Sequence, residues 1–404
     1  MAVSPLAPAQ FPELPQIVGV TFAATAAGVK YKDRLDVMLA VLQAGTSVAG
    51  VFTRSATRSA PVLDCQSKLG GDNAGAAAIL VNSGNSNAFT GKNGDGSVAA
   101  ITSAVAAATG VGQDRVFTAS TGVIGEPLPH DRINAKIAEL TQNQSPSAIE
   151  QAARAIMTTD TFAKGATATV MIDGKPVQIA GIAKGSGMIA PDMATMLVFI
   201  FTDAKISQTD LQTLVSGLNA KTFNCITVDS DTSTSDSLLV AATGASDVDV
   251  TGNADFADTL HTIMRDLAHQ VVRDGEGATK FVAVQVSGAQ DDGDAHKVAL
   301  AIANSPLVKT AIAGEDANWG RVVMAVGKSG AVADRDRLSI RFGNIIVAEN
   351  GWRAPDYSED AASAYMKNPE LEIGVDLGIG EGQSTVWTCD LTHGYIAINA
   401  DYRS

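Results

Sequence analysis

The chain has 404 residues, of which 46% are hydrophobic but only 5% aromatic, and it contains 38 glycines. Small aliphatic side chains and close backbone contacts should therefore build its core, which suits a layered α/β protein. Because 43 acidic residues outnumber 29 lysines and arginines, the net charge is -14, which argues against nucleic acid as a partner. The longest run of large aliphatic residues, 196–201, is far too short for a membrane helix of ~20 residues. Three widely spaced cysteines form no disulfide framework and favour the cytoplasm.

The first half of the chain begins with a proline-rich segment, 1–15, that should be an extended arm. Polar residues 53–62 predict a connector, and residues 76–91 predict a buried strand that ends in a loop rich in Asn, Ser and Gly. Such loops at strand ends commonly line functional sites. Further strands are expected at 37–42, 48–52 and the start of 116–129, and a helix at 97–109.

The middle of the chain should contain a β-hairpin. Residues 167–172 and 177–182 read as strands, and Asp173-Gly174 between them is typical of a type I′ turn. This hairpin leads directly to Lys184. Two helices are expected before it, one carrying Ile133, Ile137 and Leu140, and one beginning near Ser145.

The second half of the chain should contain both helices and strands. Helices are expected after Ser207, at 255–273 and at 295–303, the last ending before Pro306. Strands are expected at 238–242 and 281–286, and residues 339–404 should be mostly strand, including 384–389 and 395–399. Because strands and helices occur in clusters instead of strict alternation, the pattern favours two stacked sheets flanked by helices.

The stretch KGSGMIAPDMATMLVFIF, residues 184–201, joins a turn rich in Gly and Pro to an apolar strand. Thr195 is the hydroxyl residue at this junction. A threonine at a chain's N-terminus can act as a nucleophile without a histidine, because its own α-amine, with a pKa of about 8, serves as the base. Attack by Thr195 on the carbonyl of Ala194 would create that N-terminus. On spacing alone, the pattern favours Thr195 as an ordinary β-branched strand residue over a nucleophile.

Other residues could complete such a site, although each also has a structural interpretation. Thr121 and Gly122 could form an oxyanion hole or an ordinary turn. Lys184 could hold a carboxylate, and Glu276 an ammonium group, or both could be solvated charges. Thr158 could belong to a turn after a helix. The polar run 228–236 lacks the order of a calcium loop and favours a solvated turn, and no metal site is expected.

Several motifs together resemble a known family, the ornithine acetyltransferases of arginine biosynthesis, also called glutamate N-acetyltransferases. The resemblance covers essentially the whole chain. The matching motifs are ILVNSGNSNAFTG, STGVIG, MTTDTFAK, KGSGMIAPDMATML, DGEGATK, GEDANWGRV and the ending INADYRS. Asp192 and Ser404 stand where Asn and Thr are more usual in the family.

This resemblance implies a precursor that cleaves itself between Ala194 and Thr195. It implies an α chain of residues 1–194 and a β chain of 195–404, which share one core and one site and assemble as α2β2. The implied fold is a layered α/β/β/α sandwich like that of the N-terminal-nucleophile hydrolases, with a smaller C-terminal α/β portion. The implied site residues are Thr195 as nucleophile, Thr121 and Gly122 as oxyanion hole, and Thr158, Lys184, Thr195, Glu276, Asn399 and Ser404 as substrate contacts.

The implied reaction moves an acetyl group from N-acetylornithine to Thr195 and then to glutamate, with no cofactor. Some family members also use acetyl-CoA as a co-substrate, and the residues do not decide this point. One alternative is an aminopeptidase or amidase of similar fold, in which water receives the acyl group. Another is an uncleaved small-molecule binding protein. We expect Thr121→Ala and Gly122→Ala to fold normally and to slow turnover.

Overall fold

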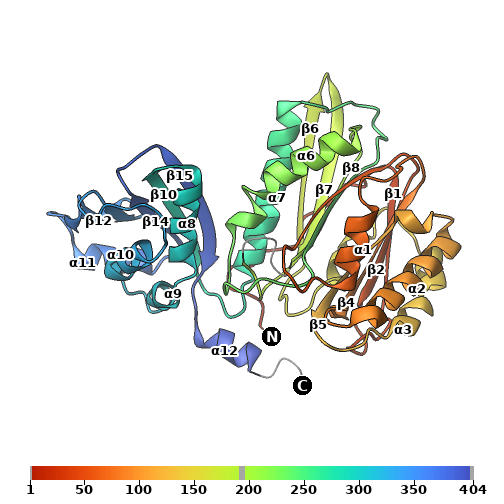
Figure 1. Cartoon of the computed structure of the whole chain (residues 1–404), viewed down its shortest axis with the longest axis horizontal. Coiled ribbons are helices and arrows are strands. Elements are labelled where there is room, and N and C mark those ends of the chain that lie inside the picture. Colours follow the sequence, from red (N-terminus) through yellow and green to blue (C-terminus); the bar gives the residue numbers. More distant parts are fainter. Residues whose placement is uncertain (1, 191–195, 401–404) are drawn as a thin grey trace. The chain divides into compact units, whose positions relative to one another are not determined.

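The computed structural model describes residues 2–190 and 196–400, and these residues form two compact units. We call the described residues of 8–224 and 231–271 the sandwich unit. We call residues 2–7, 225–230 and 272–400 the C-terminal unit. Each unit has its own sheets and helices (Figure 1). In the described part of the chain, no helix is both long and apolar enough to span a membrane.

The first sheet of the sandwich unit has four strands in the order β1-β2-β4-β5. Neighbouring strands are antiparallel except for β4 and β5, which run parallel. All nine residues of β4 are buried, as expected for a strand with both faces covered. The strands are β1 (Val20–Thr25), β2 (Val37–Leu42), β4 (Ala77–Asn85) and β5 (Val116–Val123).

The second sheet has five strands in the order β3-β9-β8-β7-β6. Its central strand, β8, is fully buried and lies parallel to β9 and antiparallel to β7. Asp173 and Gly174 have φ values of 50° and 76°, which confirms the predicted type I′ hairpin between β6 and β7. The strands are β3 (Ser47–Phe52), β6 (Lys164–Ile172), β7 (Lys175–Lys184), β8 (Leu197–Thr202) and β9 (Ser237–Ala242).

The core of the sandwich unit lies between these two sheets. Phe22 of β1 and Phe201 of β8 meet there edge to face, with ring centroids 4.9 Å apart. The same apolar cluster contains Ile79 and Phe117 from the first sheet and Phe199 from the second. Residues from both sides of position 195 therefore pack into one core.

Helices cover the outer faces of both sheets (Figure 1). On the first sheet, Ile101, Val105 and Ile133 pack against the face opposite the core. On the second, Leu267 lies against Gly181 of β7. The predicted α/β/β/α sandwich is confirmed. The helices are α1 (Ala60–Lys68), α2 (Gly91–Thr109), α3 (His130–Asn134), α4 (Ile137–Gln142), α5 (Ile149–Ala155), α6 (Gln208–Asn219) and α7 (Ala254–Arg273), with short 3-10 helices at Gln113–Arg115 and Phe223–Cys225.

The C-terminal unit is the predicted smaller α/β portion. Its six-stranded sheet has the order β13-β12-β11-β14-β10-β15, in which only β10 and β14 pair in parallel. Its strands are β10 (Phe281–Ala289), β11 (Ser339–Phe342), β12 (Ile345–Glu349), β13 (Trp352–Arg353), β14 (Glu370–Asp376) and β15 (Gly382–Cys389). Its helices are α8 (Asp292–Ala303), α9 (Pro306–Ala313), α10 (Trp319–Gly327), α11 (Glu359–Met366) and α12 (His393–Asn399).

Two segments of the region 339–404, which was expected to be mostly strand, have the wrong predicted type. Residues 359–366 form helix α11. Residues 395–399 were expected to form a strand, but they belong to helix α12. The side chain of Thr392 caps this helix by accepting a hydrogen bond from the Gly394 amide. The capping hydroxyl outweighs the strand preference of Ile396 and Ile398, which lie on a largely solvent-exposed helix.

Candidate active site

The predicted oxyanion residues lie at the end of strand β5, where it runs beside β4. Gly122 pairs with Gly84, and its φ of 129° favours glycine. A Cβ atom at Gly122 would lie 2.3 Å from the carbonyl carbon of Gly84. The expectation that Gly122→Ala folds normally is therefore wrong, because this contact between two backbones leaves no room for a methyl group.

Lys184 is the last residue of β7, and its side chain turns inward to two threonines. Its Nζ donates hydrogen bonds to Thr158 Oγ1 at 2.9 Å and to Thr121 Oγ1 at 3.2 Å. Lys184 is only 2% exposed, so it is not a solvated loop charge. In the β7–β8 ladder it lies opposite Leu197, two positions after Thr195 in the chain. Three predicted site residues thus meet in one cluster, in which Lys184 and Thr121 are buried and Thr158 is half-buried.

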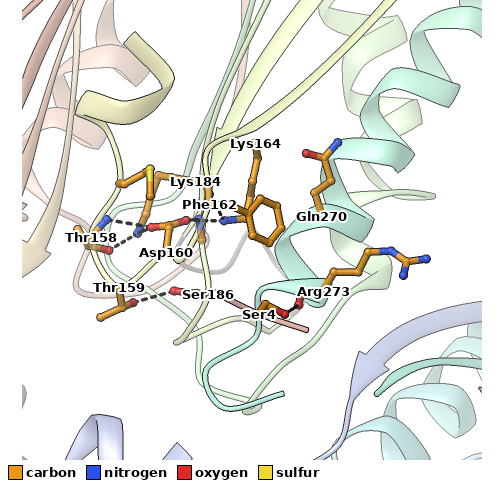
Figure 2. A network of polar contacts seen from close by, with 12 residues as sticks. Ser4, Thr158, Thr159, Asp160, Phe162, Lys164, Lys184, Ser186, Gln270 and Arg273 are labelled. Atoms are coloured by element: carbon orange, nitrogen blue, oxygen red, sulfur yellow. Dashed lines mark hydrogen bonds and ion pairs between the residues drawn. The ribbon is translucent and has the colours of Figure 1, made fainter. Parts of the chain in front are cut away.

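Asp160 lies between Lys184 and Lys164 and binds both the Thr158 and the Gly185 backbone (Figure 2). Its Oδ1 accepts hydrogen bonds from Lys164 Nζ at 2.8 Å and from the Gly185 amide at 2.6 Å. Its Oδ2 accepts from the Thr158 amide at 2.9 Å and lies 3.9 Å from Lys184 Nζ. Burial alone would raise the pKa of Asp160, but the charges of Lys164 and Lys184 outweigh burial and hold this pKa well below its ordinary value.

Asp236 is a second buried carboxyl group, placed just before strand β9. Its Oδ1 accepts a hydrogen bond from the amide of Met196 at 2.9 Å. Burial raises the pKa of Asp236 well above its ordinary value, although the Met196 hydrogen bond and the charge of Lys184 oppose this rise. Ser233, Ser235 and Asp236 are all buried, so the end of the run 228–236 is not the solvated turn that was expected.

In the C-terminal unit, Glu276 and Asn399 form a pair. Asn399 Nδ2 donates a hydrogen bond to Glu276 Oε2 at 2.6 Å. Glu276 is 8% exposed, so it is not the surface charge that its place in a glycine-rich turn allowed. Gly277 follows it with a φ of 75°, and a Cβ there would lie 2.6 Å from the Tyr395 amide nitrogen. This close approach places the turn against α12 and explains the glycine.

The remaining predicted site residues, Ala194, Thr195 and Ser404, lie outside the described residues, as does Asp192. Thr121, Gly122, Thr158 and Lys184 belong to the sandwich unit, and Glu276 and Asn399 to the C-terminal unit. Within residues 2–190 and 196–400, no group of three His, Cys, Asp or Glu side chains could hold a metal ion.

Comparisons with known proteins decide the family. The family model described as the ArgJ family matches residues 21–404. The chain belongs to the ArgJ family. The arginine biosynthesis bifunctional protein ArgJ of Ruegeria pomeroyi is 72% identical over 100% of this chain and 98% of its own. That of Agrobacterium fabrum is 54% identical over the full length of both chains. The crystal structure of the Bacillus halodurans ArgJ protein is 42% identical, covers 50% of this chain and 98% of its own, and gives a TM-score of 0.49.

Membership of the ArgJ family confirms the resemblance drawn from the motifs. Those motifs also contain residues whose part in the cluster the sequence did not reveal. Asp160 and Lys164 both lie in MTTDTFAK, and both are fully buried. Their spacing of four residues resembles a surface helix pair, but they lie in a loop and at the start of β6. Only the fold shows that Lys184 joins them.

Proposed function

We propose that the chain transfers an acetyl group from N-acetylornithine to glutamate, with Thr195 as the nucleophile. The proposal rests first on membership of the ArgJ family, a family of acetyltransferases of arginine biosynthesis, at 72% identity over the whole chain. The cluster of Lys184, Thr121 and Thr158 supports it, because these residue types suit a carboxylate-bearing substrate and a developing oxyanion.

The reaction has two halves that share one acyl-enzyme. The Thr195 hydroxyl loses its proton to the α-amine of Thr195 and attacks the acetyl carbonyl of N-acetylornithine. Thr121 and Gly122 would donate hydrogen bonds to the oxyanion of the tetrahedral intermediate. When this intermediate collapses, its C–N bond breaks, the proton passes to the leaving nitrogen, and ornithine departs. The amine of glutamate then attacks the Thr195 ester by the reverse route and gives N-acetylglutamate.

In this proposal, one positively charged and one negatively charged side chain recognise the substrate. The ammonium of Lys184 would bind a substrate carboxylate, with Thr158 beside it. The carboxylate of Glu276 would bind a substrate ammonium group, with Asn399 beside it. Ser404, which keeps the hydroxyl of the more usual Thr, would be a further contact.

We also propose that the chain cleaves itself between Ala194 and Thr195. The α and β chains, 1–194 and 195–404, would stay together because two ladders join them: β8 of the β chain pairs with β7 of the α chain, and β9 of the β chain pairs with β3 of the α chain. The shared core, including the contact between Phe22 and Phe201, would hold them further. We expect an α2β2 assembly in the cytoplasm.

The names of the relatives support a second activity. Both are called bifunctional, and we therefore propose that the chain also acetylates glutamate from acetyl-CoA, with no other cofactor. In this reaction the thiol of coenzyme A leaves in place of ornithine, and the second half of the cycle is unchanged.

Two experiments test the proposal. Mass spectrometry of the purified protein should find a fragment that begins at Thr195, and Thr195→Ala should remain full length and inactive. Incubation with N-acetylornithine should give N-acetylglutamate only when glutamate is present. Release of acetate at a rate that glutamate does not change would instead favour the amidase alternative.

A further inference from the structure

We propose that Asp160 is a positioning residue for the oxyanion hole: it holds the Lys184 ammonium, and Lys184 in turn orients the Thr121 hydroxyl. Asp160 is not among the site residues predicted from the sequence. The inference rests on the proposed acyl transfer at Thr195, but not on the identity of the amino-acid substrates.

Asp160 is itself held rigidly. Its side chain is inaccessible to solvent, and its two oxygens accept hydrogen bonds from Lys164 and from the amides of Thr158 and Gly185 (Figure 2). Lys164 is equally inaccessible, and its ammonium also lies over the ring of Phe162, 4.7 Å from the centroid. A buried carboxylate with this many donors has one stable position, because leaving any donor unsatisfied would be costly.

This fixed carboxylate sets the position of Lys184. The distance of 3.9 Å from Asp160 Oδ2 to Lys184 Nζ is an ion pair in a buried setting, where opposite charges interact strongly. Asp160 also binds two backbone amides next to this lysine: that of Thr158, whose hydroxyl Lys184 contacts, and that of Gly185, the residue after Lys184 in the chain. The lysine is therefore constrained at its head and at its backbone.

The consequence for Thr121 follows from donor and acceptor chemistry. An ammonium group can only donate hydrogen bonds, so Thr121 Oγ1 must be the acceptor in its contact with Lys184. The hydroxyl proton of Thr121 must then point away from Lys184. Among the described residues, none accepts a hydrogen bond from this hydroxyl. Its proton is available to the oxyanion of a bound acyl group, and the lysine charge makes the hydroxyl a better donor.

A double-mutant cycle tests this chain of contacts. Thr121→Val removes the hydroxyl at nearly constant shape and should lower kcat by roughly 10²-fold, as expected for one oxyanion donor. Asp160→Asn should lower kcat by about 10-fold or more. Since both changes disable the same donor, Asp160→Asn should lower kcat less than about 3-fold in the Thr121→Val background. Losses that simply multiply would overturn the proposal.

The Michaelis constant separates this role from a general structural one. Asp160→Asn should raise the KM for N-acetylornithine in the wild type and in the Thr121→Val variant, because Lys184 contacts the substrate in both. Its effect on kcat should disappear in the Thr121→Val variant. A structural defect would lower kcat equally in both. Asp247→Asn is the matched control, because it removes the carboxylate of an exposed pair with Lys205, and it should leave both constants unchanged.

Three further measures make the result of the cycle unambiguous. Rates are taken per mole of chain that begins at Thr195, counted by mass spectrometry, so that slow self-cleavage is not mistaken for slow turnover. If Asp160→Asn fails to fold, Asp160→Glu, which keeps the charge and shifts it by one methylene, replaces it in the cycle.

The cycle is repeated with p-nitrophenyl acetate, an ester whose hydrolysis needs the oxyanion hole but no amino-acid recognition. A non-additive cycle with this ester, in an enzyme inactive on N-acetylornithine, would support the positioning role and refute only the proposed substrates.

Discussion

Asn399 Nδ2 donates a hydrogen bond to Glu276 Oε2 over 2.6 Å, although 123 residues separate the two in sequence. Among the described side chains, no lysine, arginine or histidine pairs with this buried carboxylate. The Asn399 amide satisfies one oxygen of this carboxylate but brings no positive charge. An ammonium group from a substrate would supply that charge.

Glu276→Gln should therefore weaken substrate binding much more than it affects folding. The glutamine keeps a hydrogen-bonding partner for Asn399 but lacks the negative charge. We expect kcat/KM for N-acetylornithine to fall by roughly 10²-fold, the usual loss when a buried charge loses its partner. Glu370→Gln, which removes an exposed carboxylate paired with Arg273, is the control. Equal values for the two variants would remove Glu276 from the site.

Gly122→Ala should destabilise the protein, because the new methyl group would overlap the backbone of Gly84. Positive φ and overpacking each cost about 1 to 3 kcal/mol, so we expect a loss of about 2 to 6 kcal/mol. Gly125→Ala offers the comparison: this residue has a φ of 87° but nothing within 4 Å of its Cβ position, and should lose about 1 to 2 kcal/mol. Thermal or denaturant unfolding measures both, and similar losses would contradict the overlap.

Much of the sandwich unit was predictable because its strands and turns have recognisable local sequence patterns. Strand β8 is an unbroken apolar run, and the hairpin before it has the Asp-Gly pair that its turn requires. Helix α9 shows the limit. The predicted helix at 295–303 does end before Pro306, but the prediction missed the new helix that follows, which Ser305 caps and which has this proline in its first turn.

The candidate site was predictable only in part. Thr121, Thr158 and Lys184 could be named from motifs, but their meeting depends on strands that lie side by side only after folding. Asp160 and Asp236 were not assigned, because a carboxylate in a polar stretch looks solvated in sequence. Their burial, and the opposite directions of their pKa shifts, come from neighbours that only the tertiary structure supplies.

The cysteines should not react in the folded protein. Burial raises the pKa of Cys65 to about 12 and that of Cys225 to about 11, and burial also raises the pKa of Cys389. Since the thiolate is the reactive form, iodoacetamide at pH 8 should label none of the three in the native protein and all three after denaturation. Activity should survive this treatment. Rapid native labelling would contradict the buried placement.

Asp236 should make stability depend on pH in a defined direction. Its pKa is raised in the folded state, so the folded protein holds this proton more tightly than the unfolded chain. The stability that this proton contributes is complete below the unfolded pKa of about 3.9 and is lost as pH rises through the folded pKa. Asp236→Asn has no such proton to lose, and its amide oxygen can still accept from Met196. The melting temperature of the Asp236→Asn variant relative to wild type should therefore increase from pH 4 upward.

Asp249→Asn is the control. Asp249 is an exposed carboxylate whose pKa is lowered by a hydrogen bond from Thr251, so this variant should show no such increase. A constant difference for Asp236→Asn across this range would mean that Asp236 is ionised in the folded protein.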